Sequence, residues 1–209
     1  MPDVTWFRAP AGEDPGTLNA CYHALDLRVI HGHADAVALS VDGTDRTFAW
    51  LLTEAAACAG VLRALGVGVG DRVTVGFLPR ETTVVVVLAI ARVGAVAVYD
   101  DSAGAPGPVR VGTTAGGEVA ITADGEDLLW DVAMRAGRTD PAPCADVPGD
   151  AVLARHGELA LTVLAALGAS DDREAPVPPG ATLVSVGGVR LWSFDAPGTA
   201  SAGPDTLGR

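Results

Sequence analysis

Between residues 37 and 66, the spacing of apolar residues predicts a β-hairpin followed by a helix. Val37, Leu39 and Val41 alternate with small or polar residues, and a turn pattern begins at residue 42. Thr47 is then suited to cap a helix, and Gly66 stands where a left-handed residue would end it. The apolar positions of that helix recur at helical spacing, and we expect them to face a sheet: Leu51, Ala55, Cys58, Leu62 and Leu65.

The next segment predicts a strand, a buried helix and a second strand. Residues 72–78 form the first strand, which Pro79 ends. Residues 82–87 are all β-branched, and propensity alone favours a strand there. However, the apolar run continues to residue 93, beyond the length of a typical buried strand, and Gly94 separates it from another apolar run. We therefore predict a buried helix over 82–93 and a strand over 95–99.

The second half of the chain, after a loop at 101–108, is less strongly patterned. We expect strands at 109–111, 119–122 and 183–186, and helices at about 126–136 and 152–167. Small residues and Pro dominate from residue 196 onward, which is typical of a disordered tail. The predicted fold class is α/β, with a mixed sheet flanked by helices.

Composition excludes several chemistries. All 14 basic residues are Arg, so the sequence offers no Lys for a Walker phosphate loop, a pyridoxal phosphate enzyme or a Schiff-base aldolase. The net charge of −12 argues against nucleic-acid and anionic-membrane partners, because both bind clustered cations. No apolar run reaches the ~20 residues of a membrane span, and the first residues carry no signal pattern. Cys21, Cys58 and Cys144 are far apart, so we expect reduced thiols in a cytoplasmic protein.

Three short motifs resemble binding or catalytic signatures, but each has a simpler structural explanation. Residues 66–71 resemble half of a dinucleotide-binding fingerprint, but they join a helix to a strand, which favours a linker. Residues 183–187 resemble a nucleophile elbow without its first Gly, and a strand end before a Gly-Gly turn explains them better. Residues 112–117 resemble a phosphate-binding loop, but without a cation a hairpin turn is the simpler interpretation.

Two polar clusters contain ligand types found in metal or acid/base sites. His23, His31, His33 and Asp35 lack the spacing of a metal site, so we interpret the histidines as surface loop residues. The acidic pairs at 100–101 and 171–172 are better explained as solvated loop charges than as paired catalytic or Mg²⁺-binding carboxylates. We assign no catalytic and no metal-binding residue from the sequence.

Several longer segments carry a family resemblance. They are VTWF at 4–7, TLNACYHALD at 17–26, AGVLRALGV at 59–67, GDRV at 70–73, AIARVGAV at 89–96 and ITAD at 121–124. Together they resemble the amino-terminal part of acetyl- and propionyl-CoA synthetases, which belong to the AMP-forming, adenylate-forming acyl-CoA synthetase superfamily. The resemblance implies an extension at 1–36 and a partial adenylate-forming α/β core at 37–140. A divergent helix with strands at 141–195 and the tail at 196–209 would follow.

The resemblance also shows what this sequence lacks. In that family a loop ending in P-K-G holds ATP, a T-E element holds Mg²⁺, a Y-x-T-G-D element holds ribose, and a C-terminal Lys completes adenylation. None of the four is found here, and residues 177–180 stand where the phosphate loop should begin. Without these cations, the charge on a transferring phosphate group is not stabilised, so we expect no adenylation. The sequence therefore resembles a truncated and degenerate relative.

One binding segment of the family has a counterpart. Arg135, Ala136, Gly137 and Arg138 resemble the R-A-G-R segment that contacts the phosphorylated adenosine end of CoA in acetyl-CoA synthetases. In those enzymes it follows I-T-A-D almost at once, whereas residues 125–134 intervene here. A helix C-terminus explains the same residues, with Arg complementing the helix dipole and Gly137 as the cap. Arg135 and Arg138 are thus candidate CoA-binding residues, and both interpretations stay open.

Two functional hypotheses follow from the resemblance. The first is a non-catalytic acyl-CoA-synthetase-like protein that acts as a binding or regulatory module, requires no cofactor, recognises CoA or acyl-CoA, and binds a protein partner. The second is a subunit that contributes to acyl-CoA ligase activity when another chain supplies the ATP-binding and Lys elements.

Overall fold

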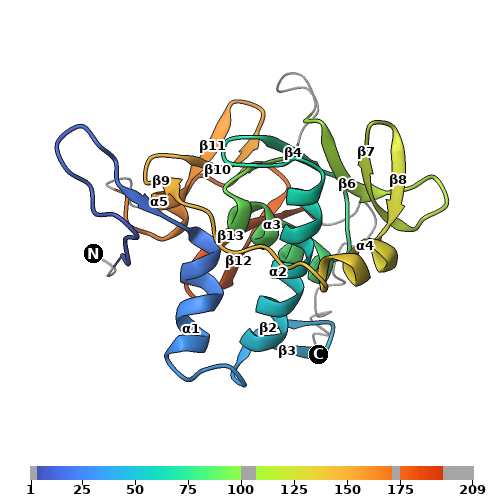
Figure 1. Ribbon diagram of the computed structural model, residues 1–209, viewed down its shortest axis with the longest axis horizontal. Coiled ribbons are helices and arrows are strands. Elements are labelled where there is room, and N and C mark those ends of the chain that lie inside the picture. Colours follow the sequence, from blue (N-terminus) through green and yellow to red (C-terminus); the bar gives the residue numbers. More distant parts are fainter. Residues whose placement is uncertain (1–3, 100–106, 171–174, 195–209) are drawn as a thin grey trace, which may run out of the picture.

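A mixed sheet of seven strands forms the centre of the part of the chain that the computed structural model describes, residues 4–99, 107–170 and 175–194 (Figure 1). The strands, in spatial order, are β11 (Leu159–Thr162), β10 (Val152–His156), β5 (Val96–Val98), β4 (Arg72–Val75), β6 (Val109–Thr113), β7 (Val119–Ala123) and β8 (Glu126–Leu129). The inner pairs β10–β5, β5–β4 and β4–β6 are parallel, and the outer pairs are antiparallel. The predicted α/β class with a mixed sheet is confirmed.

The predicted hairpin and helix at 37–66 are confirmed. Strands β2 (Val37–Val41) and β3 (Thr44–Thr47) pair antiparallel across Asp42 and Gly43, which have φ angles of 50° and 76°. The Thr47 hydroxyl accepts a hydrogen bond from the backbone N–H of Trp50 at 3.2 Å, which caps α2 (Phe48–Ala64). The predicted apolar positions are buried, except Leu65, which is half-buried. The prediction that they face a sheet is wrong, because α2 packs chiefly against the helices α3 and α4.

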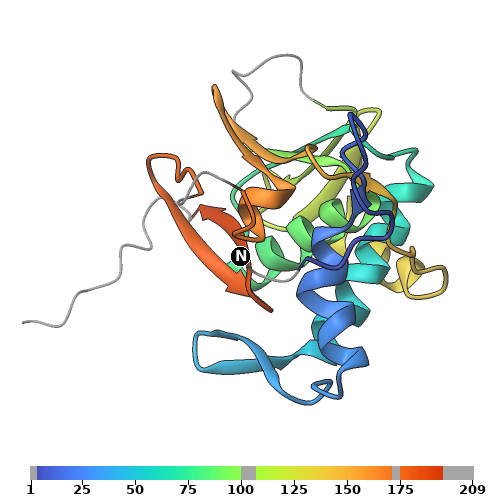
Figure 2. The ribbon, with the colours of Figure 1, turned by 90° about the vertical axis from the view of Figure 1, so that its left-hand side faces the viewer.

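Helix α3 (Arg80–Val93) occupies the segment whose β-branched residues favour a strand by propensity. It ends at Gly94, which has a φ of 76°. Every residue from 83 to 93 is buried, because α3 packs against β5, α2 and the hairpin β12–β13 (Ala181–Val186 and Val189–Phe194). Figure 2 shows that hairpin and α2 flanking α3. A helix enclosed on all sides tolerates a β-branched apolar run, since its burial outweighs its low propensity.

Two predicted helices in the second half are wrong in part. Residues 126–129 form strand β8, and helix α4 spans only Trp130–Gly137. Residues 152–162 form the β10–β11 hairpin instead of a helix, and α5 is limited to Val163–Ala166. Tight turns explain both differences. Gly157, within the second predicted helix, has a φ of 55°, which a right-handed helix does not contain. Asp124 and Gly125, with φ angles of 53° and 81°, turn the chain so that residues 126–129 pair with β7.

The remaining predictions for this half have mixed outcomes. The strands at 109–111, 119–122 and 183–186 are confirmed, and residues 112–117 include the turn between β6 and β7. Strands β10 and β11 extend the same sheet as residues 72–129, so the segment after residue 140 contributes to the core. The expected tail at 196–209 and the acidic pairs at 100–101 and 171–172 lie outside the described residues. No helix within the described ranges meets the length and hydropathy of a membrane span.

The amino-terminal segment packs along the helical layer. Strand β1 (Thr17–Leu18) pairs with β9 (Val147–Pro148), and a π-helical turn at Tyr22–Asp26 continues into α1 (Leu27–Ile30). Trp6, Trp50 and Trp130 are partly buried against the core, and Trp192 is fully buried.

Glycine allows a close crossing of α2 and α4. A Cβ added at Gly60 would overlap the carbonyl oxygen of Asp140, and one at Gly137 would overlap the carbonyl oxygen of Ala57. The backbone of α2 therefore lies directly against α4 at Gly137 and against the residues that follow α4 at Gly60, and these contacts fix the position of the α4 C-terminus.

We expect Gly60→Ala to destabilise the protein. Alanine favours a helix interior by about 1 kcal/mol over glycine, but the overlap with Asp140 should reverse this preference and cost about 1–3 kcal/mol. Thermal unfolding measures the effect. Gly68→Ala is the matched control, because the nearest atom to its added Cβ is 3.7 Å away; equal stability of Gly60→Ala and wild type would contradict the close crossing.

Candidate functional site

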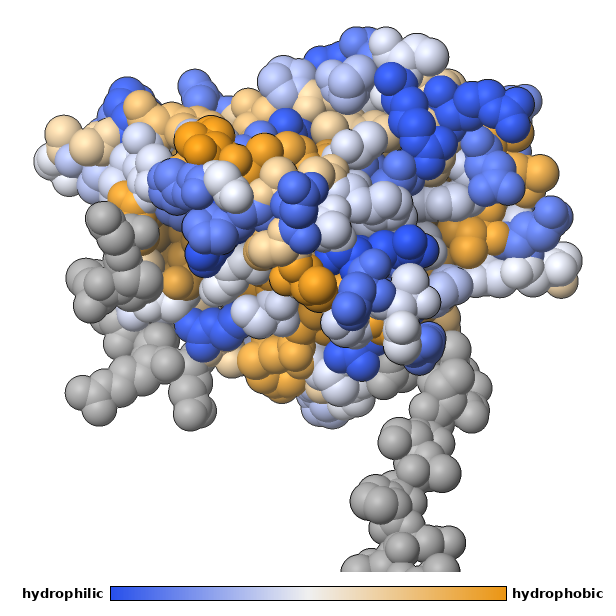
Figure 3. Space-filling model, turned by 90° about the horizontal axis from the view of Figure 1, so that it is seen from below, coloured by the Kyte–Doolittle hydropathy of each residue, from blue (hydrophilic) through white to orange (hydrophobic). Residues whose placement is uncertain are grey.

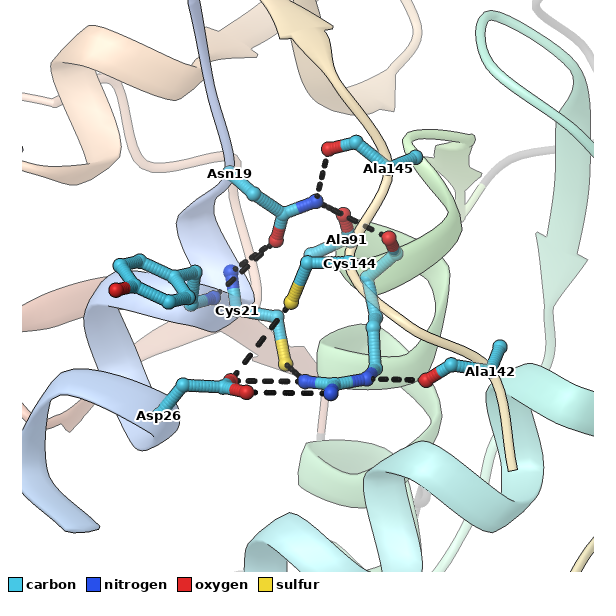
Figure 4. Close-up of polar contacts among 9 residues, drawn as sticks. Asn19, Cys21, Asp26, Ala91, Ala142, Cys144 and Ala145 are labelled. Carbon is cyan, nitrogen blue, oxygen red and sulfur yellow. Dashed lines mark hydrogen bonds and ion pairs between the residues drawn. The ribbon is translucent and has the colours of Figure 1, made fainter. Parts of the chain in front are cut away.

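A buried arginine connects the helical layer to two other segments. Arg92 lies in the last turn of α3, and its Nη1 and Nη2 atoms lie 2.8 and 3.2 Å from the carboxylate oxygens of Asp26 (Figure 4). Its Nε donates a hydrogen bond to the carbonyl oxygen of Ala142 at 2.7 Å. The side chains of Arg92 and Asp26 are only 9% and 18% exposed. The ion pair therefore joins α3 to the amino-terminal segment. The hydrogen bond to Ala142 joins α3 to residues 138–146, which we call the connecting segment.

Asn19 holds the same three segments together. Its Nδ2 donates hydrogen bonds to the carbonyl oxygens of Ala91, Arg92 and Ala145 at 3.0–3.1 Å. Its Oδ1 accepts hydrogen bonds from the backbone N–H groups of residues 21 and 22 at 3.0 and 3.2 Å. The side chain is completely buried, so it satisfies carbonyls at the end of α3 that water does not reach.

Two thiols lie against the Arg92–Asp26 pair. The Sγ of Cys21 is 3.7 Å from Arg92 Nη1, and the Sγ of Cys144 donates to Asp26 Oδ2 at 3.7 Å. A hydrogen bond to Cys21, followed by burial, raises the pKa of the Cys144 thiol. Both cysteines are free, as is Cys58, whose complete burial raises its pKa to about 12.

The two candidate CoA-binding arginines lie at the end of α4. Arg135 is in the last helical turn, Arg138 is the residue after the helix, and both are exposed. Gly137 is the last helical residue and not a left-handed cap, so that part of the helix-end interpretation is wrong. Its role is instead the close approach to α2. Because the helix continues to Gly137, residues three positions apart share one face there.

Arg138 already has an anionic partner. Its Nε and Nη2 atoms lie 3.0 and 2.7 Å from the Oε1 and Oε2 atoms of Glu54 on α2. The Glu54 side chain is 12% exposed, whereas that of Arg138 is 49% exposed. Arg135 has neither a side-chain hydrogen bond nor an ion pair within the described ranges. A phosphate bound by both arginines would therefore compete with the Glu54 carboxylate for Arg138.

A cavity of about 300 Å³ borders Arg138. It lies between α2, the end of α3 and the connecting segment, and its lining residues are Leu52, Thr53, Ala56, Arg92, Arg138 and Pro141. Apolar surface dominates the cavity, and Arg92 and Arg138 are its charged lining residues. This combination can accept an apolar group that carries an anion, which fits the chemistry of the predicted ligand but not its whole length.

No metal centre is found in the part of the chain that the structure describes. His23 is buried in the π-helical turn, contrary to the expected surface loop, and its Nε2 lies 3.0 Å from the carbonyl oxygen of Thr5. Burial lowers the pKa of His23. His31 and His33 are exposed after α1, as expected.

The predicted protein partner has no surface assigned to it. Figure 3 shows one face of the molecule, on which small apolar groups alternate with hydrophilic ones. Binding of a protein partner therefore remains a prediction.

Sequence analysis missed the residues that position the site. Asn19, Cys21 and Asp26 all fall in the TLNACYHALD run, and Arg92 is the charged residue at the end of an apolar helix. That charge was the available signal, because a guanidinium inside an apolar layer requires a buried carboxylate or several carbonyl groups. Glu54, the partner of Arg138, gave no such signal.

We expect Asp26→Asn to destabilise the fold by about 2–4 kcal/mol, because it leaves the buried Arg92 charge without its carboxylate. Chemical denaturation measures the loss. Asp140→Asn removes the carboxylate of the exposed Arg63–Asp140 pair and serves as the control, with an expected cost below about 1 kcal/mol. Similar costs for both variants would show that the Arg92 pair has no special structural role.

Comparisons with solved structures show the fold. The chain is similar to an acyl-CoA synthetase of Brucella canis, with a TM-score of 0.53, 24% identity, and coverage of 75% of this chain and 35% of that one. A benzoate CoA ligase from Burkholderia xenovorans gives the same TM-score at 17% identity and covers 72% of this chain. These similarities support the predicted fold of an acyl-CoA ligase N-terminal domain.

Comparisons with sequences show the family. An acetyl-coenzyme A synthetase of Rhodopirellula baltica is 39% identical over 92 residues, and one of Mycobacterium bovis is 33% identical over 153 residues. The aligned parts cover 39% and 68% of this chain but only 14% and 22% of the two relatives. The family described as "AMP-binding enzyme" matches residues 27–133, two residues short of Arg135. Since this match covers half of the sequence, the chain belongs to the AMP-binding enzyme family.

Proposed function

We propose that this chain is a non-catalytic member of the family that recognises CoA or an acyl-CoA through Arg135 and Arg138. The observation that carries the proposal is the position of these arginines: they lie together at the end of α4, and Arg138 borders a largely apolar cavity. A phosphate group could bind the guanidiniums while an apolar part of the ligand enters the cavity. The module would act as a binding or regulatory unit, with a protein partner and a location in the cytoplasm as further parts of the proposal.

The lack of catalytic groups supports the non-catalytic part of the proposal. Adenylation needs cations or Mg²⁺ against the developing phosphate charge, and the sequence contains no Lys. The resemblance to acetyl-CoA synthetases covers neither a P-K-G loop nor a T-E element.

Electrostatics determines how such a ligand would bind. The net charge of −12 repels a polyanion at long range, so affinity depends on local contacts. Arg135 is available for a phosphate at once, whereas Arg138 must give up part of its contact with Glu54. Glu54 would therefore lower the affinity for the ligand, and charged hydrogen bonds from the two arginines would hold it.

Membership of the AMP-binding enzyme family also supports a second candidate function. The chain would then contribute the amino-terminal portion of an acid–CoA ligase, and another chain would supply the ATP-binding and Lys elements. The two candidates differ in whether a second chain restores activity.

We expect the purified chain to show no carboxylate-dependent exchange of pyrophosphate into ATP with acetate or propionate. The reason is the missing phosphate-stabilising cation. Exchange above a no-protein blank would contradict the non-catalytic function, and exchange that appears only with a second chain would favour the alternative.

We expect CoA to bind in a calorimetric titration, and Arg135→Ala to weaken the affinity by about 10- to 150-fold, because a charged hydrogen bond contributes about 1.5–3 kcal/mol. Arg138→Ala should weaken it as well. Glu54→Gln should instead strengthen binding, because it frees Arg138 and removes a negative charge beside the cavity.

Arg63→Ala is the matched control for general charge effects, since Arg63 is an exposed α2 arginine that pairs with Asp140 outside this cavity. An effect of Arg63→Ala equal to that of Arg135→Ala would point to unspecific attraction. Absence of any heat with CoA would leave the helix-end interpretation of these arginines.

A further inference from the structure

Cys21 and Cys144 come together although they are far apart in the sequence. Cys21 lies at the start of the π-helical turn, and Cys144 lies in the connecting segment. Both thiols point toward the Arg92–Asp26 pair from neighbouring positions (Figure 4). Cys21 contacts Arg92 Nη1 and Cys144 contacts Asp26 Oδ2, each at 3.7 Å, and these two atoms are themselves only 2.8 Å apart.

The two cysteines differ in access. Cys144 is half-buried and lines a surface cavity of about 210 Å³, together with apolar residues that include Val67 and Val93. Cys21 has no exposed surface. A small reagent can therefore reach Cys144 first, and Cys21 lies behind it.

We propose that Cys21 and Cys144 form a reversible intramolecular disulfide when the protein meets a low-molecular-weight disulfide. This modification site goes beyond the proposed function, because neither CoA recognition nor the ligase alternative requires it. The proposal depends on two thiols that contact the same ion pair, and not on either cysteine alone.

The reaction is a two-step thiol–disulfide exchange. The thiolate of Cys144 attacks one sulfur of oxidised glutathione, which gives a mixed disulfide and releases one glutathione thiolate. The thiolate of Cys21 then attacks the Cys144 sulfur, forms the internal S–S bond and releases the second glutathione thiolate. The two protons lost by the cysteines are taken up by the two released thiolates. Two protein thiols are oxidised, and one glutathione disulfide is reduced to two thiols.

The surroundings of Cys144 should make the first step slow at neutral pH. Cys21 and Asp26, from the amino-terminal segment, face Cys144 and disfavour its thiolate form. Arg92, from α3, favours the thiolate. Arg63, from α2, lines the same cavity as Cys144. The hydrogen bond to Cys21 and burial raise the pKa of Cys144. Since the thiolate is the nucleophile, the rate of oxidation should rise about tenfold per pH unit between pH 7 and 9.

The disulfide would reinforce contacts that already exist. Asn19 and Arg92 hold the same two segments together, so the bond joins parts of the chain that are neighbours before oxidation. A crosslink that closes a long loop restricts the unfolded chain. We expect the oxidised protein to melt about 5–10 °C higher than the reduced protein.

The test is incubation of the full chain with oxidised glutathione at pH 8.5, followed by alkylation under denaturing conditions, intact mass measurement and peptide mapping. The number of free thiols in the wild type should fall from three to one, with Cys58 still free. Dithiothreitol should restore all three. Three thiols still free after prolonged incubation, a bond that includes Cys58, or a bond between two chains would overturn the proposal.

Three variants provide controls. In the Cys58→Ala variant, the two remaining thiols, Cys21 and Cys144, should both enter the internal bond, because Cys58 is buried in α2. Cys21→Ser should stop at a stable glutathione adduct on Cys144, and Cys144→Ser should keep both of its thiols free. Internal oxidation of either serine variant, or accumulation of the glutathione adduct in the wild type, would show that Cys21 and Cys144 do not react as a pair.

Discussion

The contact between Arg92 and Asp26 is the interaction on which the arrangement of the helical layer depends. Arg92 lies in the last turn of a helix whose other residues from 83 onward are buried and mostly apolar, so its charge has little access to bulk water. Removing a guanidinium from water costs several kcal/mol unless a carboxylate and carbonyl groups replace the water. Asp26 and the carbonyl of Ala142 supply that replacement. The amino-terminal segment and the connecting segment therefore meet at the end of α3.

The regular parts of the fold were predictable because their signals are local. The hairpin at residues 37–47, the Thr47 cap and the Gly94 helix end each depend on residues close in the sequence. The helix over 80–93 was predictable from its length and its flanking glycine, against the propensity of its residues. The strands at 126–129 and 152–162 were missed because their partners, β7 and β5, decide their conformation. Asp124 and Gly125, which precede β8, have the same residue types and positive φ angles as Asp42 and Gly43, and that similarity was the overlooked local signal.

The candidate site was predictable only in part, for a related reason. Arg135 and Arg138 came from a resemblance, and their common position at the end of α4 follows from a short helical spacing. Their environment comes from distant residues: Glu54 lies 84 positions before Arg138, and Cys144 contacts an aspartate 118 positions away. Such pairs have no periodicity in the sequence. The contact of Gly137 with α2 places Arg138 beside Glu54, and a glycine in a helix does not reveal which backbone it will touch.

The relation between Arg138 and Glu54 decides whether this site favours a ligand or only holds two helices together. An ion pair in which one side chain is about half exposed contributes about 1 kcal/mol or less, because water competes with it. A charged hydrogen bond to a phosphate contributes about 1.5–3 kcal/mol, and a guanidinium can make two of them. Exchange of Glu54 for a phosphate is therefore favourable for Arg138, provided that the displaced carboxylate regains water. Glu54 is mostly buried, so it would regain little water, and this cost falls on the ligand. The same carboxylate that stabilises the α2–α4 contact thus sets the affinity that any anionic ligand can reach, and a weak, exchangeable association is the regime this geometry supports.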